Sequence, residues 1–363
     1  MKMKKSIIWS ILLLMGTKTM LNAQDPLASF ATQRDLVKIE ASLSTAGKTL
    51  LASEKREYEQ LKRKSYRFSP NRCMNYPLTS LASLMKEDIS PLLLKKNIES
   101  NLAKLPSIKK SFEAKGIRWN PAWLVDIITI DWKKILLGAS GCSLNTSILS
   151  PVKDQGYCGS CWAFAAGAAY EHGYKLTYGS AKDVSEQDLL SCGLNCSGEN
   201  AGSCSGGWEY RALDYMLCTG AASESAYPYS NAGTTAEAAC VSNPKSMSLA
   251  GWVRIGTSYP SDDVVKAAIA TYGAVTTAVY ARGWTGYGGD VMDAYPNGSS
   301  ELVSSSGATI NHAVTIVGWC DAKGAWIVKN SWGADWGPYR GYCYVKYGHY
   351  NINARVHAAL PNP

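Results

Sequence analysis

In the first third of the chain, apolar residues recur at helical spacing. Two groups show it most clearly: Leu36, Ile39 and Leu43, and then Ile98, Leu102 and Leu105. A charged stretch at 54–64 also favours helix, and Pro106 ends the second group. We therefore predict a small, mostly helical unit over residues 24 to about 124. The alternative interpretation is a solvated linker, because the periodicity is interrupted.

The pattern changes near Trp119, where charged residues become sparse and Gly, Ser, Ala, Tyr and Trp predominate. Residues 161–178 are alanine-rich and apolar on almost every face, which predicts a buried helix. Residues 185–188, Ser-Glu-Gln-Asp ahead of two leucines, predict another helix start. Apolar runs typical of β-strands follow at 274–280, 313–319, 325–329 and 341–347. Helices followed by strands predict an α+β fold with a helical lobe and a β lobe.

The amino terminus has the pattern of an export signal. Lys2, Lys4 and Lys5 precede the apolar residues 7–15, and a small-residue cleavage site ends at Ala23. We predict a signal peptide over residues 1–23, too short to span a membrane. The chain is therefore expected to be secreted or otherwise exported (extracellular, periplasmic or lysosome-like), with no membrane span. Eleven cysteines fit an oxidising compartment, and the odd number leaves at least one as a free thiol or in an intermolecular bond.

Composition and charge narrow the function classes. With 363 residues, 46% of them hydrophobic and 18% charged, the chain is globular and fits about two folding units. Residues 1–124 contain 22 Lys and Arg against 10 Asp and Glu, whereas residues 125–363 contain 15 against 19. No groove-reading motif accompanies the basic residues, so nucleic-acid binding is not expected. We predict instead that the two parts attract each other and that acid weakens this attraction.

The segment 151–164 is the most informative for chemistry. Cys161 begins the predicted buried helix, where the helix dipole stabilises a thiolate. Gly156 and Gly159 permit a tight turn around it, and the Gln155 amide is suited to stabilise a developing oxyanion. The pattern therefore indicates a nucleophilic cysteine.

The spacing Cys158-x-x-Cys161 has two other interpretations. A dithiol redox pair requires a surrounding βαβ unit, which the pattern does not predict. A zinc site requires a second pair at similar spacing, but Cys196 and Cys204 are eight residues apart. We therefore predict neither a metal site nor any other cofactor.

A nucleophilic thiolate needs a base, and the chain contains four histidines. Three are interpreted as ordinary packed or surface residues: His172, His349 and His357. His312 enters an apolar β run and is the best-placed base, 151 residues after Cys161. Downstream, Asn330 offers a side-chain oxygen that can orient the imidazole, and Trp332 and its neighbour Trp336 can shield that hydrogen bond from water.

These residues stand in motifs that resemble the papain family of cysteine peptidases over roughly residues 131–363. The motifs, in family order, are Gln-Gly-x-Cys-Gly-Ser-Cys-Trp at 155–162, Cys-Ser-Gly-Gly at 204–207, Asn-His-Ala at 311–313 and Asn-Ser-Trp-Gly at 330–333. The resemblance implies a zymogen-derived endopeptidase with a papain-like two-lobe fold, acting on protein or peptide substrates. It makes Cys161 the nucleophile and His312 its general base and acid. Asn330 would orient His312, and Gln155 would form the oxyanion hole together with the Cys161 backbone N–H.

By the same resemblance, Gly206 and Gly207 would hydrogen-bond the substrate backbone. Trp208 and Ala278 would form walls of the main specificity pocket, which takes the second residue before the scissile bond, and Trp332 would line the site. Glu209 departs from the proline that many relatives have at this position, which leaves the pocket preference open.

The resemblance also implies two disulfides, Cys158–Cys204 and Cys192–Cys240. Five cysteines of the peptidase region then remain: Cys142, Cys196, Cys218, Cys320 and Cys343. The pairs Cys196–Cys218 and Cys320–Cys343 are possible, but sequence does not decide the connectivity. Cys73, in the expected propeptide, would stay free or couple elsewhere.

The domain plan expected from these observations has three parts: a signal peptide at 1–23, a propeptide at 24–124 and a peptidase domain at 125–363, with a helical lobe at about 140–250 and a β lobe at about 251–363. The propeptide would act as an intramolecular inhibitor, although it lacks the spaced helical motif of family propeptides. Two alternative functions are a cell-wall peptide amidohydrolase and a catalytically silent surface-binding protein. We expect a monomer.

Overall fold

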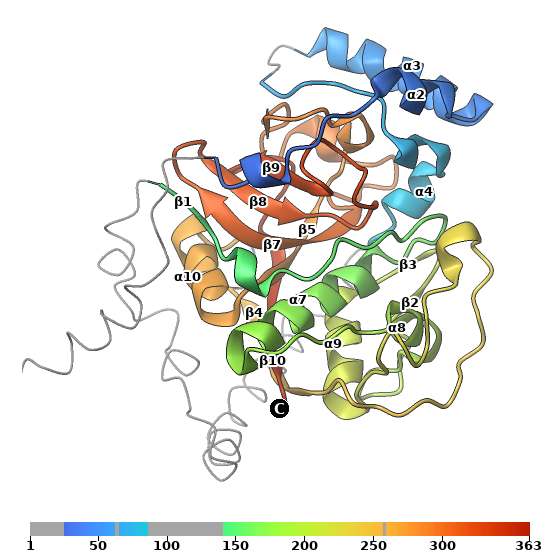
Figure 1. Ribbon diagram of the computed structural model, residues 1–363, viewed down its shortest axis with the longest axis vertical. Coiled ribbons are helices and arrows are strands. Elements are labelled where there is room, and N and C mark those ends of the chain that lie inside the picture. Colours follow the sequence, from blue (N-terminus) through green and yellow to red (C-terminus); the bar gives the residue numbers. More distant parts are fainter. Residues whose placement is uncertain (1–24, 62–64, 86–140, 257–258) are drawn as a thin grey trace, which may run out of the picture.

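The computed structural model describes residues 25–61, 65–85, 141–256 and 259–363. It has two lobes, one mainly helical and one built on a sheet (Figure 1). The described N-terminal residues lie along the β lobe and end where the two lobes meet. The predicted signal peptide and the predicted helical group at 98–105 lie outside the described residues.

The helical lobe is organised around one central buried helix. Its elements are α7 (Cys161–Tyr178), α8 (Glu186–Cys192), α9 (Glu209–Cys218), β2 (Gly202–Ser203) and β3 (Gly206–Gly207). Helix α7 spans the predicted residues and is buried along its first fourteen. It can be buried on all sides because its many small side chains allow neighbouring elements to pack closely. The Ser185 hydroxyl accepts a hydrogen bond from the Asp188 N–H (2.9 Å) and caps α8, as predicted.

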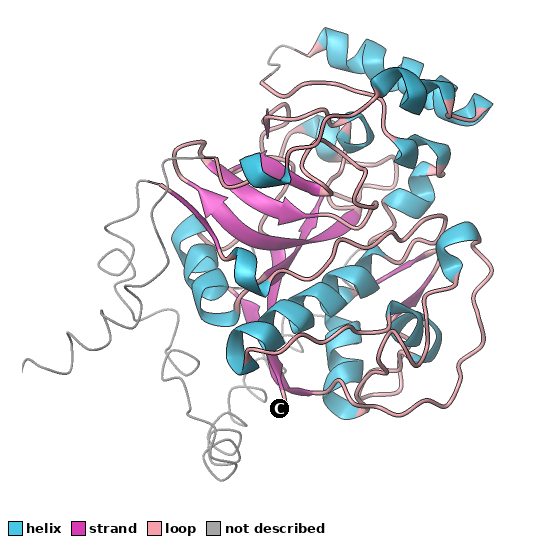
Figure 2. Ribbon diagram, in the orientation of Figure 1, coloured by secondary structure: helices cyan, strands magenta, loops and turns pink. Residues whose placement is uncertain are grey.

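The β lobe contains an open sheet, whose strands are drawn in magenta in Figure 2, and the strand order is β4-β10-β5-β7-β8-β9-β6. The strands are β4 (Leu249–Ile255), β5 (Val275–Val279), β6 (Val291–Met292), β7 (His312–Cys320), β8 (Ala325–Lys329), β9 (Tyr342–Lys346) and β10 (Ala354–Pro361), with β1 (Cys142–Leu144) paired to β7. Helix α10 (Asp262–Tyr272) packs beside β5, β7 and β10. All four predicted β runs are strands, and they read as continuous apolar runs because they are buried on both faces.

The N-terminal segment, which we define as the described residues between 25 and 85, is helical as predicted. It contains α2 (Leu36–Ala41), α3 (Thr45–Gln60) and α4 (Leu78–Leu81). Short 3-10 helices lie in this segment and elsewhere, at Ala28–Phe30, Arg72–Asn75, Thr146–Ile148, Asn231–Gly233, Trp284–Gly286 and Ser300–Leu302. Both α2 and α3 begin with side-chain caps, from Asp35 and Ser44.

Four disulfides are present, two of which are the pairs implied by the resemblance, Cys158–Cys204 and Cys192–Cys240. Cys196–Cys218 is the third. The possible pair Cys320–Cys343 is wrong, because β8 lies between the strands that carry these residues. Cys320 instead lies opposite Cys142 in the β1–β7 pairing and is bonded to it. Cys73, Cys161 and Cys343 are the free cysteines of the described chain.

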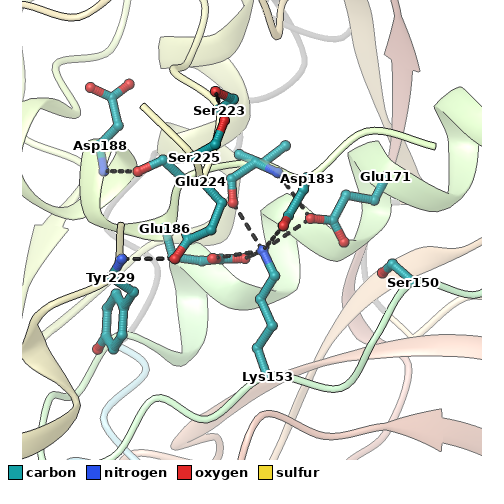
Figure 3. Close-up of polar contacts among 12 residues, drawn as sticks. Ser150, Lys153, Glu171, Asp183, Glu186, Asp188, Ser223, Glu224, Ser225 and Tyr229 are labelled. Carbon is teal, nitrogen blue, oxygen red and sulfur yellow. Dashed lines mark hydrogen bonds and ion pairs between the residues drawn. The ribbon is translucent and has the colours of Figure 1, made fainter. Parts of the chain in front are cut away.

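A buried ion cluster holds the chain that leads into the site (Figure 3). The Lys153 ammonium lies 2.8 Å from Glu186, 3.1 Å from Glu171 and 2.7 Å from Asp183. The two glutamates are almost fully buried, so they depend on Lys153 for neutralisation. Since Lys153 lies two residues before Gln155, the cluster fixes the loop between β1 and α7 against α7 and α8.

Candidate active site

Cys161 is the first residue of α7 and is fully buried. Its sulfur lies 3.8 Å from the hydroxyl of Ser83, a residue of the N-terminal segment. Burial raises the pKa of the Cys161 thiol, while the backbone N–H groups of Ala313 and Ser83 oppose this shift. The thiol therefore lies next to the start of β7 and beneath the N-terminal segment.

His312 begins β7 and is also fully buried. Its Nε2 lies 2.8 Å from the Asn330 side-chain oxygen, just after β8. Its Nδ1 has no hydrogen-bond partner among the described residues, so this nitrogen is left for another group. Burial lowers the pKa of His312 to about 4, and the hydrogen bond with Asn330 opposes the shift.

Aromatic rings surround the imidazole. The Trp332 ring centroid lies 4.8 Å from that of His312, and Trp284 packs edge-on at 6.1 Å. The ring centroid of Trp336 lies 5.4 Å from that of Trp332. These rings exclude water from the His312–Asn330 hydrogen bond. Sequence reasoning missed Trp284, because only the tertiary fold brings the turn after β5 to this site.

Gln155 is fully buried, and its side chain is fixed at both ends. Its oxygen accepts a hydrogen bond from the Ser331 hydroxyl (2.6 Å), and its Nε2 donates to the backbone oxygen of Ser80 (2.6 Å). The amide N–H thus already binds a carbonyl oxygen. Ser331 was not among the predicted site residues, although it lies directly beside Asn330 in the motif.

Residues 80–85, which we call the junction segment, run between the two lobes. The Leu84 N–H donates to the Asn311 oxygen of the β lobe (2.6 Å), and the Met85 N–H donates to the Gly207 oxygen of the helical lobe (3.1 Å). The Trp332 indole N–H donates to the Leu81 oxygen (3.1 Å). A side chain at Gly206 would lie 2.1 Å from the Ser83 oxygen, so only glycine admits this segment so closely.

The expected pocket residues lie around the same segment. Ala278 is fully buried in β5, paired with Ala313 on one side and Ala354 on the other. Trp208 is half-buried, and the Arg211 guanidinium stacks 4.1 Å from its ring centre. Glu209 is fully buried and forms an ion pair with Arg355, a residue that sequence reasoning missed because nothing local marks it.

A sequence profile described as "Papain family cysteine protease" matches residues 131–360. The chain belongs to the papain family of cysteine proteases. The predicted family is thereby confirmed, and the Cys, His and Asn motifs stand in the order that this family shares. The described part of this family member shows no group of three His, Cys, Asp or Glu side chains arranged to hold a metal ion. Nor does any described helix have the length and hydropathy needed to cross a bilayer.

Two curated relatives illustrate the similarity in sequence. The chain is 33% identical over 214 residues to a cathepsin L-like proteinase of Phaedon cochleariae, covering 58% of this chain and 57% of that protein. It is 32% identical over 211 residues to cathepsin S of Rattus norvegicus, with the same coverage. The chain thus matches less than three-fifths of the length of these relatives.

A solved structure illustrates the similarity in fold. Digestive procathepsin L 3 from the larval midgut of Tenebrio molitor superposes with a TM-score of 0.62 at 22% identity, covering 99% of this chain and 100% of that chain. At this identity the comparison concerns the fold alone. It confirms the predicted α+β, papain-like two-lobe architecture with a helical N-terminal segment.

Proposed function

We propose that the chain is the precursor of an exported cysteine endopeptidase, held inactive by its own N-terminal segment. One observation carries this proposal: the Cys161 thiol at the start of α7, the His312–Asn330 pair and the Gln155 amide surround a single place, and residues 80–85 fill it. Family membership supports thiol-dependent hydrolysis of peptide bonds.

In the proposed mechanism, His312 accepts the thiol proton through Nδ1, while Asn330 holds the opposite ring nitrogen. The thiolate attacks the peptide carbonyl carbon, and the resulting oxyanion takes the place that the Ser80 oxygen occupies at Gln155. His312 then protonates the leaving amine, and water hydrolyses the thioester. The peptide bond is cleaved without any redox change.

The covered site favours the neutral forms of both reacting groups. Burial raises the pKa of Cys161 and lowers that of His312, so the thiolate–imidazolium pair is disfavoured beneath the N-terminal segment. Removal of the segment hydrates the site and allows the helix dipole to stabilise the thiolate. The segment therefore blocks access and also suppresses the reactive charge state.

The direction of the junction segment contributes to the proposed inhibition. Leu84 pairs with Gly207 in a parallel arrangement, and Ser83 presents its hydroxyl to the thiol. The Ser83 carbonyl oxygen lies against Gly206 instead. This geometry gives the sulfur no carbonyl carbon to attack at Ser83.

The test uses the precursor without its first 23 residues, incubated from pH 4 to 8 with mild reductant. We expect loss of roughly 100 residues and rising cleavage of quenched peptides, neither of which occurs in Cys161→Ala. Trace addition of an unrelated protease distinguishes self-processing from activation by another enzyme. Cleavage of muropeptides but not of peptides would support the amidohydrolase alternative, and biological function that persists in Cys161→Ala would support the silent scaffold.

We further propose the boundaries expected from sequence, with maturation near residue 124 and a monomeric peptidase of residues 125–363. The Cys142–Cys320 disulfide supports a mature chain that starts before residue 142, because this bond ties β1 to the β lobe. N-terminal sequencing of the processed protein tests the boundary. Light scattering of the same sample tests the monomer.

A further inference from the structure

Three alanines form a row across the sheet at the place where the junction segment lies. Ala313 of β7, Ala278 of β5 and Ala354 of β10 are direct partners in the two pairings, so their side chains share one face. The row begins beside His312 and ends beside Arg355. Leu84 of the junction segment belongs to the same buried apolar cluster as these alanines.

Arg355 is turned toward this place by an irregularity in β10. Three steps along β10, from 354 to 357, are matched by two steps along β5, from 278 to 276, so β10 contains an extra residue. Arg355 has φ +49°, in the left-handed region that non-glycine residues rarely adopt. Bulges of this kind re-aim a side chain and are common beside active sites.

The Arg355 side chain is 4% exposed and divides its hydrogen bonds between enzyme and N-terminal segment. Its Nη2 donates to the Glu209 carboxylate at 3.0 Å, which fixes the guanidinium against the start of α9. Its Nη1 donates to the backbone oxygen of Met85 at 3.0 Å. Its Nε is buried without a hydrogen-bond partner among the described residues.

We propose that Arg355, held by Glu209, selects substrates whose second residue before the scissile bond ends in an oxygen acceptor: Glu, Gln, Asp or Asn. The proposal rests on the proposed peptidase function. When the N-terminal segment leaves, the Nη1 donor loses the Met85 oxygen and becomes open to a substrate acceptor. A substrate side chain that lies over the alanine row and supplies an oxygen restores this hydrogen bond, with charge assistance when it is a carboxylate. A lysine or arginine side chain instead meets the guanidinium and is disfavoured.

The experiment compares peptides that differ only at this position, with Glu, Gln, Leu or Lys, using peptidase matured from the full precursor. For the unmodified enzyme we expect kcat/KM for Glu and Gln to exceed that for Lys by at least about tenfold, in line with a charge-assisted hydrogen bond. Equal rates for Lys and Glu would overturn the proposal without any variant.

The variant is the double substitution Glu209→Gln with Arg355→Gln, which leaves no buried charge without its partner. We expect its Glu-to-Leu ratio of kcat/KM to fall about tenfold. Lys266→Gln, which removes a largely buried cation of α10 paired with Asp321, is the control and should keep the original ratio. An unchanged ratio in the double variant overturns the proposal. If no peptide is cleaved although iodoacetamide labels Cys161, the peptidase function itself fails, and the selectivity falls with it.

Discussion

Two parts of the N-terminal segment bind the rest of the molecule in different ways. The anchor, which we define as the described residues 25–76, lies on the β lobe and depends on particular buried side chains, chiefly Asn71. The junction segment, residues 80–85, is held mainly through its own main chain: Ser80, Leu81 and Met85 contribute backbone oxygens, and two backbone N–H groups donate. Particular polar side chains thus fix the anchor, whereas the block over Cys161 depends on main-chain hydrogen bonds together with the buried side chains of Leu81 and Leu84.

The charged contacts of the anchor refine the predicted attraction between the two parts. Basic residues of the anchor form two ion pairs with the β lobe, and acidic residues form two more. The pairs are Arg67–Asp290, Arg72–Asp335, Glu57–Arg282 and Asp25–Lys323. All of these side chains are at least partly exposed, so each ion pair contributes little to the free energy that holds the anchor on the β lobe. Net charge alone therefore describes the attachment poorly, and the buried contacts matter more.

The largest effect is expected from breaking the anchor at Asn71. Its amide donates to the Thr285 and Tyr287 oxygens (2.6 and 3.0 Å), and its oxygen accepts from the Gly337 N–H (3.0 Å). Asn71→Ala leaves these groups unsatisfied, which weakens docking of the N-terminal segment by about 2 kcal/mol. The peptidase activity of the unprocessed precursor should therefore rise roughly 30-fold. Arg72→Gln, which removes an exposed ion pair, is the control and should change that activity less than about threefold. Equal effects of the two substitutions would contradict the distinction between buried and exposed anchor contacts.

A smaller effect is expected from removing a main-chain donor in the junction segment. Met85→Pro abolishes the N–H that donates to the Gly207 oxygen, at a cost of about 1 kcal/mol, and should raise precursor activity about fivefold. Met85→Ala keeps the N–H, and because Met85 is 41% exposed the change should be below about twofold. Initial rates on a small peptide, measured before processing, provide the comparison. If alanine releases as much activity as proline, the segment is held by its side chains.

The smallest effect concerns pH and the anchor carboxyl of Glu54. Burial raises the pKa of Glu54 to about 7, while contacts with Thr285 and the Gly286 N–H oppose the shift. A carboxyl with a raised pKa in the docked state stabilises docking in acid, and this contribution is lost as the pH rises through 7. Glu54 thus opposes the predicted acid release. Glu54→Gln should flatten the pH dependence of docking and tighten inhibition at pH 8 by about threefold, allowing for partial exposure. The check is the inhibition constant of the isolated N-terminal segment against the peptidase, measured with and without Glu54→Gln across pH 5–8. A steeper pH profile for the Glu54→Gln segment would refute the prediction.

Much of the fold was predictable because its signals are local. Residues 161–178 are apolar all round, and the structure makes them the buried helix α7. The run at 325–329 is β8, and Ser185 caps α8 as its neighbours indicate. The wrong disulfide possibility, Cys320–Cys343, shows the limit. Strand order is non-local, and the sequence does not reveal that β1 lies beside β7 or that β8 separates β7 from β9.

The candidate site divides in the same way. Cys161, His312, Asn330 and Gln155 stand in short motifs whose chemistry is readable one residue at a time. Trp284, Ser331 and Arg355 were missed because their roles come from contacts across the fold. The sequence predicted an inhibitory propeptide over residues 24–124 but did not mark residues 80–85 as the part that crosses the site, since main-chain hydrogen bonds leave little trace in the choice of side chains.

The sequence by itself determined the family, the candidate reactive groups and the order of helices and strands. A nucleophile, a base and an oxyanion-binding amide each require a particular residue type, and burial imposes a helical or strand period on the apolar residues. Tertiary structure alone decided which oxygen the Gln155 amide binds, that Ser83 covers the thiol and that a bulge aims Arg355 at Glu209. These features depend on where distant segments meet. These long-range contacts follow from packing of the whole chain, which no local sequence pattern encodes.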